Sequence, residues 1–220
     1  MKLYYSPGAC SFASHIVLNE LGHPFEVERV VIANGDNLKP EYLKINPRGR
    51  VPVLLVDGAV IRENSAILTW LGQQGAGLFP PVGSIPAARA SEWLAWLTSA
   101  VHISFGQIWR GHRFSDDATH HASIRARGLT VLGEQFDEIE RALSRTSYVL
   151  GEDYSVIDAN ILPFYRWGTR VGFSMRSRFP HWTRHTERML DRDAVRRTIA
   201  VEGIDMWPPK DAWVVDGQGR

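Results

Sequence analysis

The sequence predicts a chain in two parts, a mixed α/β part followed by an all-helical part. Over residues 1–75, short apolar runs with strand-like alternation take turns with runs that repeat at helical spacing. Glycine and proline then crowd residues 75–86, a composition that is typical of a linker. After this stretch only helical spacing returns. We therefore expect a small sheet-containing domain joined to a helical domain.

The first part follows the order strand, helix, strand, then a β-hairpin and a last helix. Gly22 ends the first helix, because glycine tolerates the left-handed conformation found just past many helices. Alternating apolar residues predict a half-buried second strand, and Asp57-Gly58 predicts the hairpin turn. The first two strands are expected to be parallel and the hairpin antiparallel. The expected elements are strand 3–5, helix 11–21, strand 25–32, hairpin 51–61 and helix 63–73.

In the second part, the helical spacing of apolar residues predicts helices over 88–110, 123–144, from 159 onward and 182–190. Ser155 and Asp158 have the spacing of a capping box, which opens the helix that follows. The tail from Pro208 is polar and is expected to lie draped over the surface or frayed. We divide the chain into a domain over 1–76, a linker over 77–86, a helical domain over 87–203 and a tail over 204–220.

Composition narrows the class of protein. The 220 residues carry 25 Lys and Arg against 24 Asp and Glu, so no basic field predicts nucleic-acid binding. The single cysteine excludes an intramolecular disulfide and suits a reducing compartment. Neither a signal peptide nor an apolar run long enough for a membrane span is evident. No Cys/His group has zinc spacing. We expect a cytoplasmic protein without metal.

Cys10 stands at the turn between the first strand and the first helix. Free backbone N–H groups and the positive end of the helix dipole at such a turn favour a thiolate over a thiol. A free cysteine is also commonly a small buried hydrophobic residue. Position alone leaves both interpretations open.

Three motifs stand in order ahead of the helical part. They are YSPGACS at 5–11, NPRGRVPVL at 46–54 and ENSAI at 63–67. Together with the two-part pattern they resemble the cytosolic glutathione S-transferases, and most closely the bacterial beta class. The resemblance implies an α/β thioredoxin-like N-terminal domain plus an all-α C-terminal domain, glutathione as co-substrate, and a homodimer.

The resemblance also implies which residues bind glutathione. Val51-Pro52 would be a cis peptide, and the backbone of Val51 would pair with the cysteinyl part of glutathione. The helix that opens at Glu63-Asn64 would bind the γ-glutamyl carboxylate, with Asn64 in place of the usual serine. Ala9 and Cys10 complete the expected set. Ala100 stands where beta-class members often carry an acid that reaches the glutathione amine across the dimer.

His102 is the expected partner of Cys10. On its helix it lies beside the apolar stripe, among small residues, and it aligns with a beta-class histidine that faces the cysteine across the domain cleft. A surface or interfacial histidine is the alternative. His15 is a rival, for which we favour a structural or domain-contact role. Tyr5 or Ser11 would become the activating hydroxyl if Cys10 were inert.

The predicted function is glutathione transfer to a hydrophobic electrophile, in a pocket walled by Phe12, Trp109 and Trp167. Monothiol glutathione–disulfide exchange at Cys10 is a second mode, since no resolving cysteine is present. For this mode we expect a thiol of low pKa that forms a mixed disulfide with glutathione. The alternative is a non-catalytic binding or regulatory protein of the same fold, towards which Asn64 and Ala100 point.

Overall fold

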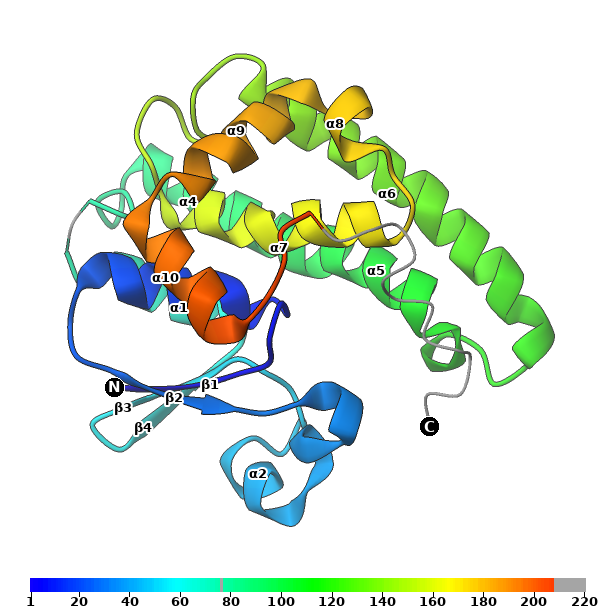
Figure 1. Ribbon diagram of the computed structural model, residues 1–220, viewed down its shortest axis with the longest axis horizontal. Helices are drawn as coiled ribbons and strands as arrows, with labels where there is room; N and C mark the ends of the chain where they lie inside the picture. The colour runs from blue at the N-terminus through cyan, green and yellow to red at the C-terminus, as the bar shows by residue number, and fades with distance from the viewer. Residues whose placement is uncertain (76, 208–220) are drawn as a thin grey trace.

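The computed structural model describes residues 1–75 and 77–207. Its first part holds a four-stranded sheet in the order β2-β1-β3-β4, with β1 parallel to β2 and antiparallel to β3, and β3 antiparallel to β4 (Figure 1). The expected pairing is therefore confirmed. The strands are β1 (Lys2–Tyr5), β2 (Glu26–Arg29), β3 (Val53–Val56) and β4 (Ala59–Arg62).

Helices cover both faces of this sheet. α1 (Ser11–Leu21) lies on one side and α2 (Pro40–Ile45) on the other (Figure 1). α3 (Asn64–Gly72) follows β4 in the chain. Gly22 ends α1 at φ 68°, as expected. α2 was not predicted from the sequence. The prediction of a half-buried second strand is wrong: β2 is exposed throughout, because it is an edge strand with only β1 beside it.

The second part is helical. Its helices are α4 (Ile85–Trp96), α5 (His102–Trp109), α6 (His121–Leu143), α7 (Val156–Arg170), α8 (Met175–Arg178), α9 (Pro180–Leu190) and α10 (Asp193–Glu202). The first of them begins three residues earlier than predicted, since Ser84 caps it by accepting from the Ala87 N–H at 3.2 Å. The end of the predicted linker is therefore helical. The domain limits themselves stay a prediction, and the tail from Pro208 lies outside the described residues.

The single long helix predicted over 88–110 is interrupted. Residues Leu97–Val101 form a π-helical turn between α4 and α5. A π-turn inserts a residue into the helical ladder, and such turns often occur next to functional sites. This one ends directly before His102, so it determines which face of the helix that side chain occupies.

Asp158 anchors the start of α7. Its carboxylate accepts from the N–H and hydroxyl of Ser155 at 2.8 and 2.9 Å, which confirms the predicted capping box. It also accepts from the Val149 N–H and contacts His185 Nε2, both at 2.9 Å. Since Asp158 is fully buried, these partners are needed to compensate for the water it lost.

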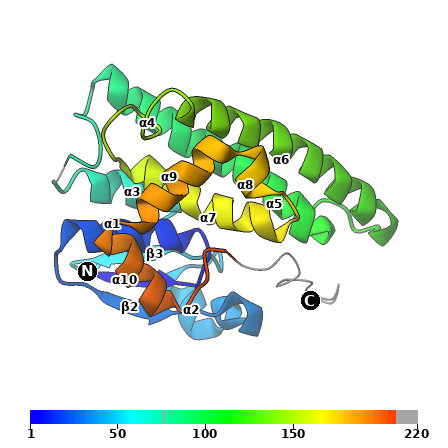
Figure 2. The same ribbon diagram turned by 45° about the horizontal axis from the view of Figure 1, so that its top comes forward.

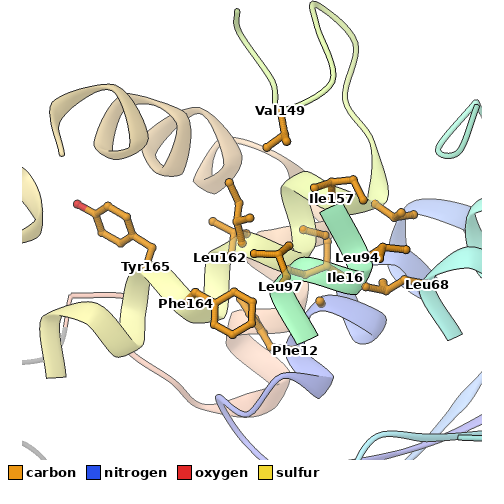
Figure 3. Packing of buried hydrophobic residues seen from close by; sticks show 14 of the residues in the cluster. Phe12, Ile16, Leu68, Leu94, Leu97, Val149, Ile157, Leu162, Phe164 and Tyr165 are labelled. Atoms are coloured by element: carbon orange, nitrogen blue, oxygen red, sulfur yellow. The ribbon is translucent and has the colours of Figure 1, made fainter. Parts of the chain in front are cut away.

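One apolar core joins the two parts of the chain. Phe12 and Ile16 of α1 lie beside residues of α4 and α7 (Figure 3). On its other side α1 is flanked by α10 near the C-terminal end of the described chain (Figure 2). α1 is therefore packed between the sheet and the helical part. No helix within the described residues is long and apolar enough to cross a membrane.

Candidate functional site

Cys10 lies directly before α1, in the loop that follows β1. Its side chain is half-buried, and its thiol donates to the Val51 carbonyl with Sγ and O 3.6 Å apart. The Val51–Pro52 peptide is cis, as the resemblance implied. The thiol and the backbone that precedes Pro52 thus face each other, although they stand 41 residues apart in the chain.

The loop before Cys10 is held by the helical part. The Gly8 N–H donates to Glu202 Oε2 at 2.7 Å, and Trp167 Nε1–H donates to the Gly8 carbonyl at 2.8 Å. Gly8 has φ 65°, and a Cβ there would lie 2.6 Å from Nη1 of Arg166. Only glycine fits this position without moving its neighbours.

Glu202 also contacts the rival histidine. His15 Nδ1 lies 3.0 Å from Glu202 Oε1, and both side chains are buried. His15 therefore has the domain-contact role that we favoured. Sequence reasoning missed Glu202, because an acid at the end of an amphipathic helix gives no signal that it will be buried 187 residues from its partner.

The two alternative hydroxyls have other roles in the structure. The Ser11 hydroxyl accepts from the Ser6 N–H and donates to the Ser6 carbonyl, each at 3.1 Å, and the residue is fully buried. Tyr5 is buried against His15, and burial raises the pKa of its phenol. Neither hydroxyl is placed as well as Cys10 to meet a ligand.

The start of α3 differs in part from expectation. Glu63 has φ 71°, a strained conformation for a residue other than glycine, and its carboxylate pairs with Arg48 at 2.6 Å. The Asn64 side chain accepts from Ser14 at 2.6 Å and donates to Asn160 at 2.8 Å. The Asn64 side chain is thus held by α1 and α7, and its role towards glutathione stays a prediction. The backbone N–H groups of the first turn remain available to bind a ligand.

His102 packs on the same tryptophan that holds Gly8. Its ring lies 5.3 Å from that of Trp167 and 5.9 Å from that of Phe164. Within the described residues, no hydrogen bond or ion pair joins His102 to Cys10. His102 reaches the Cys10 loop through Trp167. Residues 1–75 and 77–207 contain no group of three or more His, Cys, Asp or Glu that could hold a metal ion.

The three side chains that were predicted to wall the pocket differ in whether they lie in the core or reach the surface. Phe12 is fully buried between α1 and α7 and lines no surface, which corrects its assignment (Figure 3). Its position in α1 turns it towards the core and away from the loop. Trp109 is 40 % exposed and stacks on Phe105, and its ring lies 5.4 Å from that of Trp167. Trp167 is buried and lies behind Trp109, so Trp109 is the wall candidate that faces solvent and Trp167 supports it.

Desolvation sets the charge state of the two central groups. Burial raises the pKa of the Cys10 thiol to about 11, although the backbone N–H groups of Cys10 and Ser11 lower it. Burial also lowers the pKa of His102 to about 4, and the charges of Arg110 and Arg50 lower it further. The expected thiolate is therefore corrected: at neutral pH the thiol is protonated and the imidazole is neutral, because loss of water outweighs the helix dipole.

Comparison with known proteins gives one consistent result. The family models "Glutathione S-transferase, N-terminal domain" and "Glutathione S-transferase, C-terminal domain" match residues 8–74 and 113–193. Glutathione S-transferase GstA of Escherichia coli O157:H7 is 30% identical over 212 residues, which cover 93% of this chain and 100% of that protein.

Two solved structures illustrate the likeness of fold. The beta class glutathione S-transferase of Sphingomonas chungbukensis is 29% identical, with a TM-score of 0.83. A sphingomonad glutathione S-transferase complexed with glutathione is 30% identical, with a TM-score of 0.82. Each alignment covers 93% of this chain and 100% of the other.

The thiol of Cys10 should react slowly with electrophiles at neutral pH. With a pKa of about 11, only about one molecule in ten thousand carries the thiolate at pH 7. We expect iodoacetamide to alkylate the folded protein ~100-fold more slowly than a free cysteine peptide, with the rate rising about tenfold per pH unit up to pH ~10. Mass spectrometry measures the rate, and protein unfolded in urea is the control. Alkylation of the folded protein at pH 6 as fast as that of the peptide would contradict the raised pKa.

Protonation of His102 should destabilise the fold in acid. The folded pKa is about 4 and the ordinary value is 6.5, so the unfolded state binds more protons between those values. The free energy of unfolding should therefore fall as the pH drops from 6.5 to 4, by up to about 3 kcal/mol. Urea titrations at pH 7.5 and 4.5 should show a smaller difference for His102→Gln than for the unchanged protein. Exposed His112→Gln is the control. If the free energy of unfolding depended on pH equally in His102→Gln and in the unchanged protein, the lowered pKa of His102 would be disproved.

Proposed function

Because the chain belongs to the glutathione S-transferase family, we propose that it transfers glutathione to a hydrophobic electrophile. The observation that carries the proposal is the contact of Cys10 Sγ with the Val51 carbonyl. This contact brings the thiol to the backbone that precedes the cis proline, and the Ser14–Asn64 hydrogen bond holds the first turn of α3 beside α1. These are the groups that can orient a peptide thiol such as glutathione.

Glutathione binds, in this proposal, along the backbone of Val51 with Ala9 and Pro52 beside it. Val51 offers its N–H to the extended peptide, and its C=O becomes available as well once the Cys10 thiol turns from it to the glutathione sulfur. The γ-glutamyl carboxylate lies at the N-terminus of α3, where the backbone N–H groups of Asn64 and Ser65 point out of the helix and attract an anion. The Glu63 carboxylate is available for the glutathione amine, although it must share its charge with Arg48.

Cys10 acts as a hydrogen-bond donor. A protonated thiol beside the glutathione sulfur donates its S–H to that sulfur and stabilises the glutathione thiolate. Thiol–disulfide exchange needs the Cys10 thiolate as nucleophile, and a pKa of about 11 works against it. Conjugation is therefore the main activity that we propose, in place of exchange or of a purely binding role.

His102 serves as a neutral support of the site. At pH 7 its imidazole carries no charge, so it cannot lower the pKa of Cys10 by attraction. It packs on Trp167, which in turn holds the Gly8 carbonyl. Trp109, supported by Trp167, then forms the apolar wall for the electrophile. The proposed reaction consumes reduced glutathione, and the chain has a single free thiol. Both features suit the cytoplasm, and the reaction suits a role in detoxification.

We also propose that the protein is a homodimer, joined across α3 and α4. A groove of about 390 Å³ runs between these helices, lined in part by Ala66, Trp70, Leu94 and Ala95. Small residues on its walls allow the backbone of a second copy to approach closely. Because a two-fold interface places the same patch on both partners, the groove of one copy would receive the side chains of the other.

The reaction is tested by conjugation of glutathione to 1-chloro-2,4-dinitrobenzene. We expect turnover by the unchanged protein, a loss of ~10-fold or more in kcat for Cys10→Ala, and near-complete retention for Cys10→Ser, because a hydroxyl can donate the same hydrogen bond. Binding to glutathione resin should persist in both variants. Full activity in Cys10→Ala would reject the donor role, and absence of both turnover and resin binding would reject the proposed function.

The dimer is tested by sedimentation at micromolar concentration. Ala95 is exposed on α4, so Ala95→Glu should leave the fold intact and put a charge into the groove. We expect a dimer for the unchanged protein and a monomer for Ala95→Glu. Ala126→Glu, on the exposed face of α6, is the matched control and should stay dimeric. A monomer without any substitution would refute the interface.

A further inference from the structure

The C-terminal end of α5 carries an arginine whose charge is not compensated. Arg110 follows Trp109 and is half-buried. Within the part of the chain that the structure describes, neither a carboxylate nor a carbonyl accepts from its guanidinium. Other half-buried or buried arginines differ: Arg192 pairs with Glu20, and Arg166 donates to the Asp205 carbonyl.

The surroundings of Arg110 are cationic. Burial lowers the pKa of its guanidinium, and the charges of Arg113 and Arg50 lower it further, whereas the ionised form of Cys10 raises it. Arg110 is therefore within electrostatic reach of the reacting centre. Glu63 also acts on Cys10, but its carboxylate is already paired with Arg48. An uncompensated and partly desolvated guanidinium binds an anion more strongly than one in water does.

Two exposed aromatic side chains flank Arg110 in the sequence, and one of them is connected to the Cys10 loop through Trp167. Trp109 and Phe114 are 40 % and 44 % exposed, whereas most other large aromatic side chains of residues 1–75 and 77–207 are covered. The Trp109 ring lies 5.4 Å from that of Trp167, whose Nε1–H is bonded to the Gly8 carbonyl. A flat ring laid on Trp109 would thus lie next to the tryptophan that holds the Cys10 loop and beside the residue that Arg110 follows in the chain.

We infer that the electrophile of this transferase is an aromatic acid, held with its ring on Trp109 and its carboxylate on Arg110. The inference rests on the proposed function. Arg110 belongs to the helical part and follows the exposed indole, whereas the expected glutathione contacts, Val51 and Glu63, lie on the sheet part. Arg50 directly precedes Val51 and supplies the positive charge on the glutathione side.

Two probes that differ only in charge test the inference. They are 4-chloro-3,5-dinitrobenzoate and the corresponding amide. In both, the glutathione sulfur forms a bond to the ring carbon that bears chlorine, the C–Cl bond breaks, chloride leaves and the thiol proton passes to solvent. The carboxylate takes no part in the bond changes, so any preference for it comes from binding.

We expect kcat/KM, divided by the rate of the uncatalysed reaction, to favour the acid over the amide by ~10-fold or more. Arg110→Gln should reduce this preference to about one, with the KM for glutathione unchanged, and Arg110→Lys should restore part of it. Exposed Arg113→Gln removes a nearby charge and is the matched control. An unchanged preference in Arg110→Gln overturns the inference, as does an equal loss for acid and amide with a raised KM for glutathione.

Binding of the two glutathione conjugates separates this inference from the proposed function. Calorimetry of the unchanged protein should show that the acid conjugate binds ~10-fold or more tightly than the amide conjugate, and Arg110→Gln should remove the difference. This readout does not depend on turnover. Equal binding of the two conjugates overturns the inference even where conjugation is observed. Tighter binding of the acid conjugate without turnover supports the inference and rejects only the proposed reaction.

Discussion

The position of Cys10 depends on the two hydrogen bonds that hold the backbone of Gly8. Trp167 fixes its carbonyl and Glu202 fixes its N–H, so the two successive peptide units that flank Gly8 are both attached to the helical part. The bond to a buried carboxylate is charge-assisted and therefore strong. Since Glu202 also contacts His15, α1, α10 and the loop form one connected unit. Sheet and helical parts cannot move apart without releasing the loop that carries the thiol.

Burial of this unit explains the charges of the site. The same loss of water raises the pKa of the Cys10 thiol and lowers that of His102, because it disfavours the anion of one and the cation of the other. A neutral thiol and a neutral imidazole remain. The fixed positive charges around them belong to Arg50 and Arg110. Such a site suits the binding of anions, and the thiolate of glutathione is one.

The sequence predicts those features whose causes are local. Gly22 ends α1, Ser155 and Asp158 open α7, and Asp57-Gly58 turns the hairpin, because each depends on backbone geometry within a few residues. The cis Val51–Pro52 peptide was foreseen only through the family resemblance, since most X–Pro bonds in folded proteins are trans. Local signals were thus sufficient for the order of most elements, and the resemblance supplied the fold.

Features decided by distant contacts were missed. The Asn64 amide turns to Ser14 and Asn160, and helical periodicity alone could not show that Asn160 would lie there. Phe12 follows Cys10 by two residues, yet it points into the core. The raised pKa of Cys10 was missed for the same reason: the helix dipole can be read from the sequence, but the extent of burial around the thiol cannot.

The π-turn before His102 has a consequence for how this helix is compared with others. Each residue of an α-helix advances the side-chain direction by about 100°. An inserted residue at Leu97–Val101 therefore changes the angular phase of everything that follows, from His102 to Arg110. In a relative without this turn, the residue at the same number of positions after Ala88 would point its side chain in a different direction. Two such chains correspond in space only when the alignment opens a one-residue gap inside what looks like a continuous helix.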